Sequence, residues 1–292
     1  MAEPYVVARD LGKAFDGRPV LAHLDFVVAP GDIVGVLGEN GAGKTTLLEL
    51  ILGYTPPSAG SVTVFGHESR RLPGADKRRI GFVPQTDELV SHLTVAAHIA
   101  LISSFYAAWD AALVARLVQK WGIDTRVRVG TMSVGQRQKL AIVLALGHRP
   151  DLLLLDEPVA SLDPIARRHF LEEIVEIATD ERRAVIFSSH IVADIERLAN
   201  RIWIVRGGAL LWAGDADTLR SSVVRLHLRA CATPLEHLSL PNAIRIEPFA
   251  NGGIAVMRDW RDELTADIAA RAGGSLELER LTLEEIFLEL HR

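Results

Sequence analysis

Continuous apolar runs and helical periodicity alternate along the first 220 residues. The runs lie within IVGVL, DLLLLDEP and AVIFSSH, at residues 33–37, 151–158 and 184–190. Short apolar runs bounded by polar residues are typical of strands in a parallel sheet that is covered on both faces. Between the last two runs, apolar residues recur at helical spacing: Leu171, Ile174, Val175 and Ala178. This strand–helix–strand order predicts an α/β core with right-handed crossovers.

Two flanking regions have other patterns. Residues 4–30 predict short strands joined by turns, ahead of the buried strand at 33–37. Residues 94–121 have a helical pattern, and the overlapping stretch at residues 93–109 comes nearest to an apolar membrane span. Because polar side chains interrupt that stretch, we expect a helix packed on protein and not a membrane span.

The pattern changes near residue 220. The segments VVRLHLRA, AIRIE, GIAVMR and SLELER predict strands of a small sheet with intervening turns. DELTADIAARAGG predicts a helix that ends at glycine, and TLEEIFLEL predicts a final helix. We therefore expect two domains, a larger one at residues 1–220 and a small α+β domain at residues 221–292.

Composition narrows the classes of function. The 292 residues include 32 basic and 37 acidic side chains, a formal net charge of −5, which argues against a nucleic-acid partner. Cys231 is the single cysteine, so an internal disulfide is excluded and a cysteine-based metal site is not expected. This suits a reducing compartment. The first ten residues, MAEPYVVARD, do not have the pattern of a signal peptide.

The most specific chemical motif is GENGAGKTT at residues 38–46. It fits G-x-x-x-x-G-K-[ST] and stands between a predicted strand and a predicted helix, as a phosphate-binding loop requires. Backbone N–H groups of such a loop converge on phosphate, its lysine reaches the β- and γ-phosphates, and its hydroxyl binds Mg²⁺. The residues predicted to bind the nucleotide here are Gly38, Asn40, Gly41, Gly43, Lys44, Thr45 and Thr46.

Hydrolysis of a nucleoside triphosphate also needs a carboxylate near the metal and a group that positions water. In LLLLDEP, Asp156 ends a buried strand and is the expected metal partner, and Glu157 is the candidate general base. Taken alone, Asp-Glu-Pro is equally well a helix-start signal. Its occurrence with the phosphate loop favours the catalytic interpretation.

Three further residues each have an ordinary structural explanation. His190 precedes a predicted helix and is either a helix-entry residue or a donor to the γ-phosphate. Gln85, in FVPQTDELV, has the features of an exposed loop glutamine. Asp163 followed by Pro164 is typical of a helix N-cap with proline at the first helical position.

Six motifs follow one another along the chain: GENGAGKTT, Gln85 in VPQ, MSVGQ, LLLLDEP, SLDP and His190 in SSH. In this order they resemble the ATP-binding cassette (ABC) transporter ATPases, and the resemblance covers residues 4–220. The resemblance implies the P-loop ABC ATPase fold, which has a mixed or parallel core sheet, an antiparallel β subdomain and an α-helical subdomain. It implies ATP and Mg²⁺ as ligands, with Thr45, Gln85 and Asp156 near the metal. It also implies that Glu157 is the catalytic carboxylate and His190 the switch histidine.

The resemblance assigns Phe15, in GKAFDG, to the position that stacks on adenine, although a buried core aromatic is the alternative. It further implies that two chains pack head to tail around two ATP molecules. In that arrangement the residues that reach the opposite subunit are Ser133, Gly135, Gln136 and Asp163.

The segment TMSVGQRQK also has a purely local interpretation. Ser133 followed by Gln136 is a capping box that opens a helix. The family signature is usually Leu-Ser-Gly-Gly-Gln, so Met132 is a mild change and Val134 a larger one, because valine does not adopt positive φ as glycine does. Hydrolysis is still expected because Glu157 is kept.

Two segments narrow the type of cassette. FYAAWDAALVARLVQKWGID resembles bacterial cassettes of ABC-2-type exporters, near the bacitracin and acetoin-linked group, with Ala107 where that group has proline. LTLEEIFLELHR resembles the end of drug-export cassettes or is an ordinary amphipathic helix. The resemblance implies a second cassette and a multi-span permease as partners. The expected location is cytoplasmic, peripheral on the inner face of the cell membrane.

Other classes stay open at this point. A translation- or DNA-associated ABC ATPase would carry two cassettes or long coiled coils, which this chain does not show, and an importer cassette is the third possibility. The basic segment RRLPGADKRR is either a solvated loop or a contact with anionic lipid or the permease.

Overall fold

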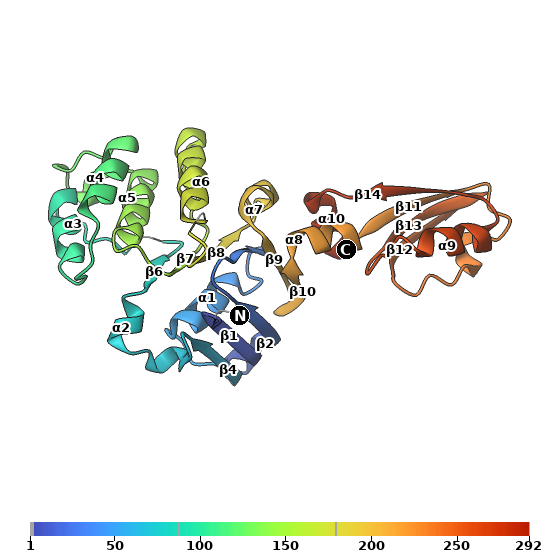
Figure 1. Cartoon of the computed structure of the whole chain (residues 1–292), viewed down its shortest axis with the longest axis horizontal. Coiled ribbons are helices and arrows are strands. Elements are labelled where there is room, and N and C mark those ends of the chain that lie inside the picture. The colour runs from blue at the N-terminus through green and yellow to red at the C-terminus, as the bar shows by residue number, and fades with distance from the viewer. Residues whose placement is uncertain (1–2, 87, 179, 292) are drawn as a thin grey trace. The chain divides into compact units, whose positions relative to one another are not determined.

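A six-stranded sheet forms the centre of the larger part of the molecule, with strand order β10-β9-β3-β8-β7-β6 (Figure 1). The pairs β3–β8, β3–β9, β7–β8 and β6–β7 are parallel. The strands are β3 (Ile33–Leu37), β6 (Ile80–Val83), β7 (Leu152–Leu155), β8 (Ala184–Ser189), β9 (Arg201–Arg206) and β10 (Ala209–Asp215). Every residue of β3, β7 and β8 is buried, which explains their uninterrupted apolar runs.

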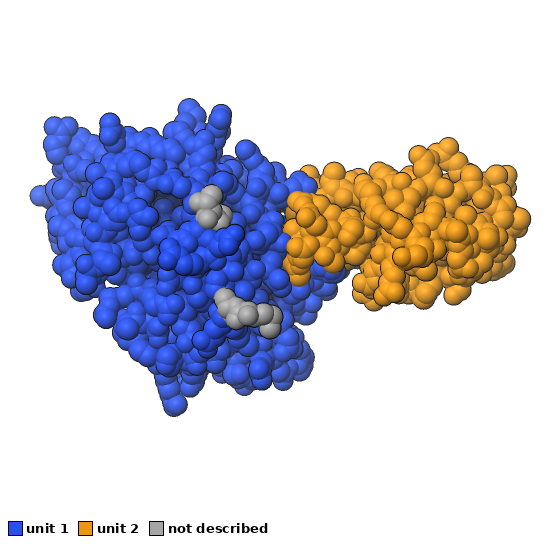
Figure 2. All heavy atoms as spheres, viewed as in Figure 1, with its two compact units in different colours: residues 1–213 blue, residues 214–292 orange. Residues whose placement is uncertain are grey.

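This structure is a computed structural model, and it describes residues 3–86, 88–178 and 180–291. The chain divides into two compact units, residues 1–213 and 214–292, which Figure 2 colours separately. The domain boundary expected between residues 220 and 221 falls inside helix α8 (Ala216–Ser222), and that exact division stays a prediction.

Helices connect the parallel strands as the crossover pattern requires. They are α1 (Lys44–Leu52) after β3, α5 (Val134–Leu146) before β7, α6 (Pro164–Ala178) between β7 and β8, and α7 (Val192–Leu198) between β8 and β9. In α6, Leu171 and Ile174 are buried, but Val175 is 50% exposed. The helix expected from this spacing is present, and its buried stripe is narrower than the apolar pattern because Val175 stays largely exposed.

A second sheet, antiparallel, packs against the core through a shared hydrophobic cluster that includes side chains of α1 and β3. Its order is β2-β1-β4-β5, from β1 (Val6–Phe15), β2 (Arg18–Val28), β4 (Ala59–Val64) and β5 (His67–Glu68). The expectation of short strands is wrong for β1 and β2, which have 10 and 11 residues. Register shifts within the pair interrupt the alternation that would have identified one long hairpin.

The helical region contains α3 (Val95–Ser103), α4 (Ala111–Lys120) and α5, which lie together in Figure 1. The single helix expected over residues 93–109 is wrong, because α3 ends at Ser103. The Tyr106 ring stacks on His148 with 4.1 Å between centroids, and the Asp110 carboxylate caps α4 by accepting from the Leu113 N–H. No helix in the described part of the chain is long and apolar enough to cross a membrane.

Short helical turns complete the larger unit, namely η1 (Ser69–Arg71), α2 (Gly74–Lys77) and η2 (Val129–Thr131). Together the parallel core, the antiparallel sheet and the helical region confirm the expected α/β cassette architecture.

The smaller unit is a four-stranded antiparallel sheet with strand order β12-β13-β11-β14. Its elements are α8, β11 (Val224–Arg229), η3 (Leu235–His237), β12 (Ala243–Phe249), β13 (Gly252–Met257), α9 (Leu264–Ala272), β14 (Ser275–Arg280) and α10 (Leu283–Leu290). Helix α9 ends at Gly273 with φ +63°, and α10 begins with a capping box between Thr282 and Glu285. The α+β pattern expected here from the sequence is present.

Candidate nucleotide-binding site

The loop between β3 and α1 has the conformation of a phosphate-binding loop. Gly41 and Gly43 have φ values of +82° and +102°, and a Cβ on Gly43 would lie 2.7 Å from the Leu21 Cδ2 atom. Glycine is therefore required at residue 43, both for its backbone and for space. Glu39 and Asn40 are exposed at the tip. The loop thus presents an open rim of backbone N–H groups at the start of α1.

Lys44 folds back over this loop. Its ammonium donates hydrogen bonds to the carbonyl oxygens of Gly38 at 2.8 Å and Glu39 at 3.2 Å, and the residue is buried. The same ammonium lies 3.4 Å from the Glu157 Oε1 atom. Lys44 is consequently held between the loop and the predicted catalytic carboxylate, where an incoming phosphate would replace the carbonyl oxygens as its partner.

Asp156 stands directly after β7 with both carboxylate oxygens in hydrogen bonds. Its Oδ2 atom accepts from the Thr45 hydroxyl at 2.7 Å, and its Oδ1 atom accepts from the Ser188 hydroxyl at 2.6 Å. Its backbone N–H donates to the Val83 carbonyl of β6 at 2.9 Å. Asp156 is buried, so these contacts fix the position of its charge between three neighbouring elements of the core.

Glu157 has the unusual backbone of the site. Its φ is +48°, a left-handed conformation that costs a non-glycine residue about 1–3 kcal/mol. The Glu157 Oε2 atom lies 2.7 Å from His190 Nδ1, and the residue is 6% exposed. Among the described residues, no hydrogen bond reaches Glu157 Oε1. The strained backbone therefore directs a largely buried carboxylate towards both Lys44 and His190.

His190 follows β8 and keeps its ring half-exposed. Because a carboxylate only accepts hydrogen bonds, the imidazole nitrogen facing Glu157 must carry a proton for this contact to be a hydrogen bond. The structure thus brings five predicted residues together at the carboxyl ends of β3, β7 and β8, and they are Lys44, Thr45, Asp156, Glu157 and His190.

One residue of this group was missed from the sequence. Ser188 is fully buried, donates to Asp156 Oδ1 and accepts from the Glu157 N–H at 2.8 Å. It links the two carboxylates that follow β7 to the neighbouring strand. The available signal was a polar side chain in the otherwise apolar run AVIFSS, two residues before His190.

The structure does not bring Gln85 into this group. Gln85 is exposed two residues after β6, and no hydrogen bond joins its side chain to the described residues. Thr46 lies in the first turn of α1 and is half-buried. Phe15 is 45% exposed at the end of β1, with the Lys13 ammonium 4.6 Å from its ring centroid. The alternative of a buried core aromatic at residue 15 is therefore wrong, and contact with adenine stays a prediction.

The predicted capping box at the start of α5 is confirmed. The Ser133 hydroxyl accepts from the Gln136 N–H at 3.2 Å, and Gln136 Oε1 accepts from the Ser133 N–H at 2.8 Å. Val134 is the first residue of the helix and has no positive φ, so valine causes no backbone strain there. A Cβ on Gly135 would lie 2.7 Å from the Ser161 carbonyl, so glycine allows close approach of the turn before α6.

That turn is tied to α5 by charge as well. The Asp163 carboxylate caps α6 by accepting from the N–H groups of Ile165 at 3.0 Å and Ala166 at 2.9 Å, and lies 3.3 Å from the Lys139 ammonium. The Ala166 hydrogen bond, and then Lys139, lower the pKa of Asp163. Ser133, Gln136 and Asp163 are all exposed. Their hydrogen bonds and the Lys139 ion pair lie within α5 and the start of α6, so together they form one exposed surface.

The oxygen donors of the site suit Mg²⁺. Thr45 and Asp156 supply one hydroxyl and one carboxylate beside the loop. The described residues contain no group of three or more His, Cys, Asp or Glu side chains that could hold a metal by themselves. Mg²⁺ is commonly held by one or two protein oxygens with phosphate and water supplying the others, so these residues fit the ion.

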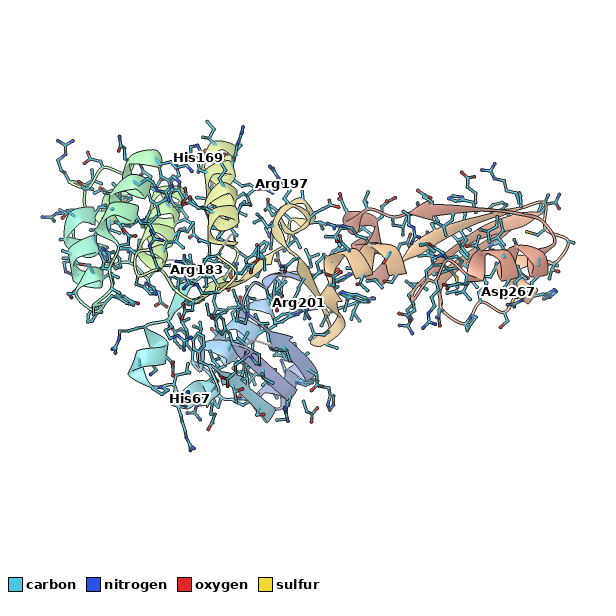
Figure 3. The ribbon with its side chains drawn as sticks, viewed as in Figure 1. His67, His169, Arg183, Arg197, Arg201 and Asp267 are labelled. Carbon is cyan, nitrogen blue, oxygen red and sulfur yellow. The ribbon has the colours of Figure 1, made fainter. Side chains whose placement is uncertain are left out.

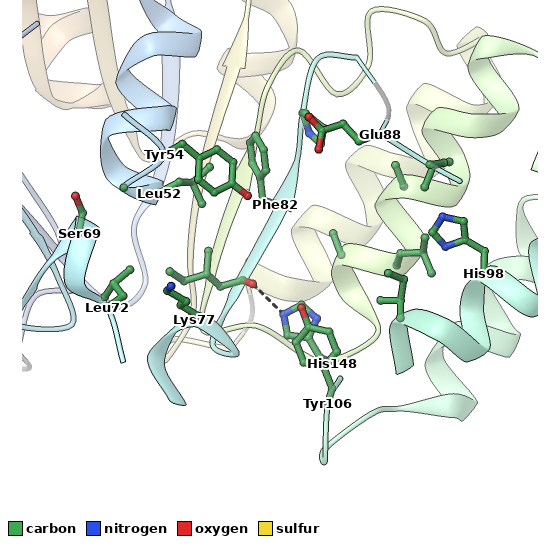
Figure 4. Close-up of a pocket in the computed structure, with 18 of the residues that line it drawn as sticks. Leu52, Tyr54, Ser69, Leu72, Lys77, Phe82, Glu88, His98, Tyr106 and His148 are labelled. Atoms are coloured by element: carbon green, nitrogen blue, oxygen red, sulfur yellow. Dashed lines mark hydrogen bonds between the residues drawn. The ribbon is translucent and has the colours of Figure 1, made fainter. Parts of the chain in front are cut away.

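A hollow lies between the core and the helical region, apart from the phosphate-binding loop (Figure 4). It has a volume of about 470 Å³, and its lining is mostly apolar and aromatic, including Tyr54, Phe82 and Tyr106. His98 and His148 also line it, and burial lowers the pKa of both. The His148 Nε2 atom is 3.1 Å from the Ile80 carbonyl, the contact drawn in Figure 4. We call this hollow the groove.

Comparisons with known proteins agree with this geometry. The family model described as ABC transporter matches residues 21–160. The Nod factor export ATP-binding protein I of Burkholderia thailandensis is 32% identical over 288 residues, covering 95% of this chain and 94% of that protein. The bacitracin transport ATP-binding protein BcrA of Bacillus licheniformis is 33% identical over 213 residues, 72% of this chain and 70% of that protein.

Longer relatives also match. The rat ATP-binding cassette sub-family A member 7 is 30% identical over 308 residues, and the chain spans only 14% of its length. Among solved structures, an ATP-binding subunit of an ABC transporter superposes with a TM-score of 0.67 at 29% identity, covering 74% of this chain and 92% of that one. A dimeric ATP-binding cassette with ADP and Pi superposes with a TM-score of 0.65 at 20% identity, covering 72% of this chain and 98% of that one. At this identity the similarity shows a shared fold and no more.

Proposed function

The chain belongs to the ATP-binding proteins of ABC transporters, which are ATPases, and from this membership we propose that it energises a separate membrane permease for export. Two relatives support this proposal. One is named for Nod factor export and the other for bacitracin transport, and each is named as an ATP-binding protein. The chain covers 94% and 70% of their lengths.

The observation that carries the catalytic part is the convergence of Lys44, Thr45, Asp156, Glu157 and His190 beside the phosphate loop. In the proposed mechanism the loop N–H groups and the start of α1 bind the phosphates, and Lys44 moves from the loop carbonyls to the β- and γ-phosphates. Thr45 and Asp156 would hold Mg²⁺, with Gln85 nearby, and the ion when bound neutralises phosphate charge.

Glu157 and His190 have complementary roles in this mechanism. The Glu157 carboxylate orients a water molecule and accepts its proton while the water oxygen bonds to the γ-phosphorus. The bond from that phosphorus to the bridging oxygen of ADP breaks at the same time, and phosphate leaves. Once ATP is bound, His190 would turn from its 2.7 Å contact with Glu157 and donate a hydrogen bond to the γ-phosphate instead, because a neutral imidazole has a single N–H. The Ser188 contacts keep Glu157 in position for this work.

A second cassette completes the proposed site. Ser133, Gln136 and Asp163 are exposed on one prearranged surface with the half-buried Gly135, as a contact with the nucleotide of another chain requires. The start of α5 also favours negative charge through its helix dipole. Phe15, exposed at the end of β1, is the proposed platform for adenine. Two chains would therefore close on ATP and separate after hydrolysis.

The groove is the proposed docking site for the permease. It lies at the junction of the core and the helical region, and its apolar and aromatic lining is suited to a protein segment. A permease there would hold the chain at the inner face of the membrane as a peripheral cytoplasmic subunit. Movement of the helical region relative to the core would then be transmitted to the permease.

The catalytic proposal is tested with Glu157→Gln and Lys44→Ala, with Glu181→Gln as a control at an exposed carboxylate. Glu157→Gln should bind ATP and lose at least about 100-fold in phosphate release, because the proton acceptor is gone. Lys44→Ala should lose ATP binding, and Glu181→Gln should match the parent protein. Undiminished hydrolysis by Glu157→Gln would refute the assignment.

The transport proposal is tested by co-purification. A multi-span permease encoded beside this chain should co-purify with it and raise its ATPase rate, and Tyr54→Asp in the groove should abolish both effects. Exclusive co-purification with ribosomes or DNA would contradict the proposal and favour a non-transport ATPase.

A further inference from the structure

Four cations stand together on the surface beside the groove. Arg70 and Arg71 belong to η1, Lys77 belongs to α2 and Arg78 follows it, and all four are exposed. We call these four residues the basic face. Arg71 is 3.5 Å from the Glu68 carboxylate, and both partners are well exposed. Within the described residues, no ion pair is formed by Arg70, Lys77 or Arg78. Their charges are therefore free for another partner.

The segment that carries these cations is firmly anchored. The Ser69 hydroxyl donates to the Leu50 carbonyl at 2.8 Å, and both Ser69 and Leu72 are buried. At the other end, the Arg79 guanidinium lies 3.8 Å from the Phe65 ring centroid and pairs with Asp151 at 2.7 Å. The basic face is thus a fixed surface, which is different from the freely moving charges of a solvated loop.

An exposed aromatic side chain, Tyr54, neighbours this face. Arg70 and Lys77 line the groove, and Tyr54 in the same lining is 68% exposed. Figure 4 shows Lys77, Leu72 and Tyr54 on the core side of the groove. Cations next to exposed aromatic rings are typical of protein surfaces that meet the headgroup region of a bilayer.

We propose that the basic face binds the anionic lipid surface of the membrane directly, beside the permease. This inference rests on the proposed function, because the groove next to the face is the proposed permease site. The chain as a whole carries a net charge of −5 and is repelled by an anionic bilayer. A fixed group of four cations reverses that repulsion locally and turns the groove towards the membrane. The exposed Tyr54 ring beside these cations favours lipid over an acidic protein segment.

The test is co-sedimentation of the purified full chain with vesicles at low salt. The chain should bind phosphatidylcholine vesicles containing about one third phosphatidylglycerol and not pure phosphatidylcholine vesicles. Each cation near an anionic surface contributes about a five-fold gain in binding. The variant Arg70→Gln, Arg71→Gln, Lys77→Gln, Arg78→Gln should therefore bind at least about 100-fold more weakly. Raising the salt should weaken binding of the parent protein.

A charge-matched control separates this face from net charge. It removes four other exposed cations through Arg9→Gln, Arg168→Gln, Arg197→Gln and Arg229→Gln. Figure 3 shows Arg197 on α7, well apart from His67, which precedes the basic face in the chain. This control should keep most of the vesicle binding, and so should Arg70→Lys, Arg71→Lys, Arg78→Lys. Unchanged melting temperatures would confirm that each variant is folded.

Two results would overturn the inference. One is absence of binding to the anionic vesicles by the parent protein, and the other is equal loss of binding in the control and the basic-face variant. If vesicle binding is absent while the permease still co-purifies, the lipid contact is refuted and the transport function stands. If the variant then loses co-purification with permease in neutral lipid, the basic face binds the permease and not lipid.

Discussion

Ser188→Ala is the sharpest perturbation of the site that leaves every predicted catalytic residue in place. The hydroxyl accepts from the Glu157 N–H at 2.8 Å and donates to Asp156 Oδ1 at 2.6 Å. Ser188 is fully buried, so water does not replace the lost oxygen. The substitution therefore leaves a backbone donor unsatisfied and removes one hydrogen bond from a buried carboxylate.

The size of the effect follows from these two losses. An unsatisfied buried N–H costs about 1–3 kcal/mol, and a hydrogen bond to a charged group contributes about 1.5–3 kcal/mol. The two share one oxygen and are not independent, so we expect a loss of about 3 kcal/mol in the free energy of unfolding. For a unit of this size, that loss lowers the melting temperature by about 6–12 °C.

Ser189→Ala is the matched control, because Ser189 is also buried but contacts neither carboxylate. Its hydroxyl accepts from the Ile191 N–H at 2.9 Å. The hydroxyl also donates to the Ile191 carbonyl at 3.4 Å, and removing these contacts with one neighbour should cost about 1 kcal/mol, or about 2–4 °C. Calorimetry measures both variants, and phosphate release should fall about 10- to 100-fold in Ser188→Ala alone, because Glu157 loses its backbone anchor. Equal melting temperatures and equal rates in the two variants would refute the positioning role of Ser188.

Three further predictions concern the groove and the start of α5. Burial lowers the pKa of His148, so below about pH 6.5 the unfolded chain binds more protons than the folded chain, and the stability present above that pH is lost as the pH falls. His148→Gln should therefore flatten the dependence of melting temperature on pH between about pH 7.5 and 5.5. An unchanged slope would contradict this. Gly135→Ala should separate α5 from the Ser161 carbonyl and slow ATP turnover without weakening ATP binding to the monomer; a parent-like rate would argue against it. Val134→Gly should leave ATP turnover within about two-fold of the parent protein, because residue 134 already has a helical backbone. It should lower the free energy of unfolding by up to about 1 kcal/mol, measured by thermal unfolding. A large rise in turnover would show instead that valine restrains the site.

The strands and the phosphate loop could be predicted because their signals are local. GENGAGKTT specifies its own turn and helix, and LLLL at 152–155 is a buried strand whatever its neighbours are. The capping box at Ser133 is likewise contained within four residues. Ser188 was missed because its importance depends on a contact with residues after the adjacent strand, about thirty positions away.

The end of α3 shows the same limit. No glycine or proline marks the break after Ser103, so periodicity alone carried the helix to residue 109. What holds the following segment out of the helix is the stacking of Tyr106 on His148 and the Asp110 cap, together with its contact with Arg149. The Asp110 cap is local, but the contacts of Tyr106 with His148 and of Asp110 with Arg149 join segments about forty residues apart, and a local pattern does not contain them. In the smaller unit, the buried Glu289 between Arg225 and Arg245 was equally invisible in the sequence.

The close approach of Gly135 to Ser161 and the pairing of Asp163 with Lys139 make a single body of two segments that are about 25 residues apart. A partner chain that contacts one of these segments therefore finds the other segment at a fixed position beside it. Once the first contact forms, the second forms at the high effective concentration of an intramolecular step. Release follows the same rule in reverse, so such a pair of chains would separate in one step and not by gradual loosening.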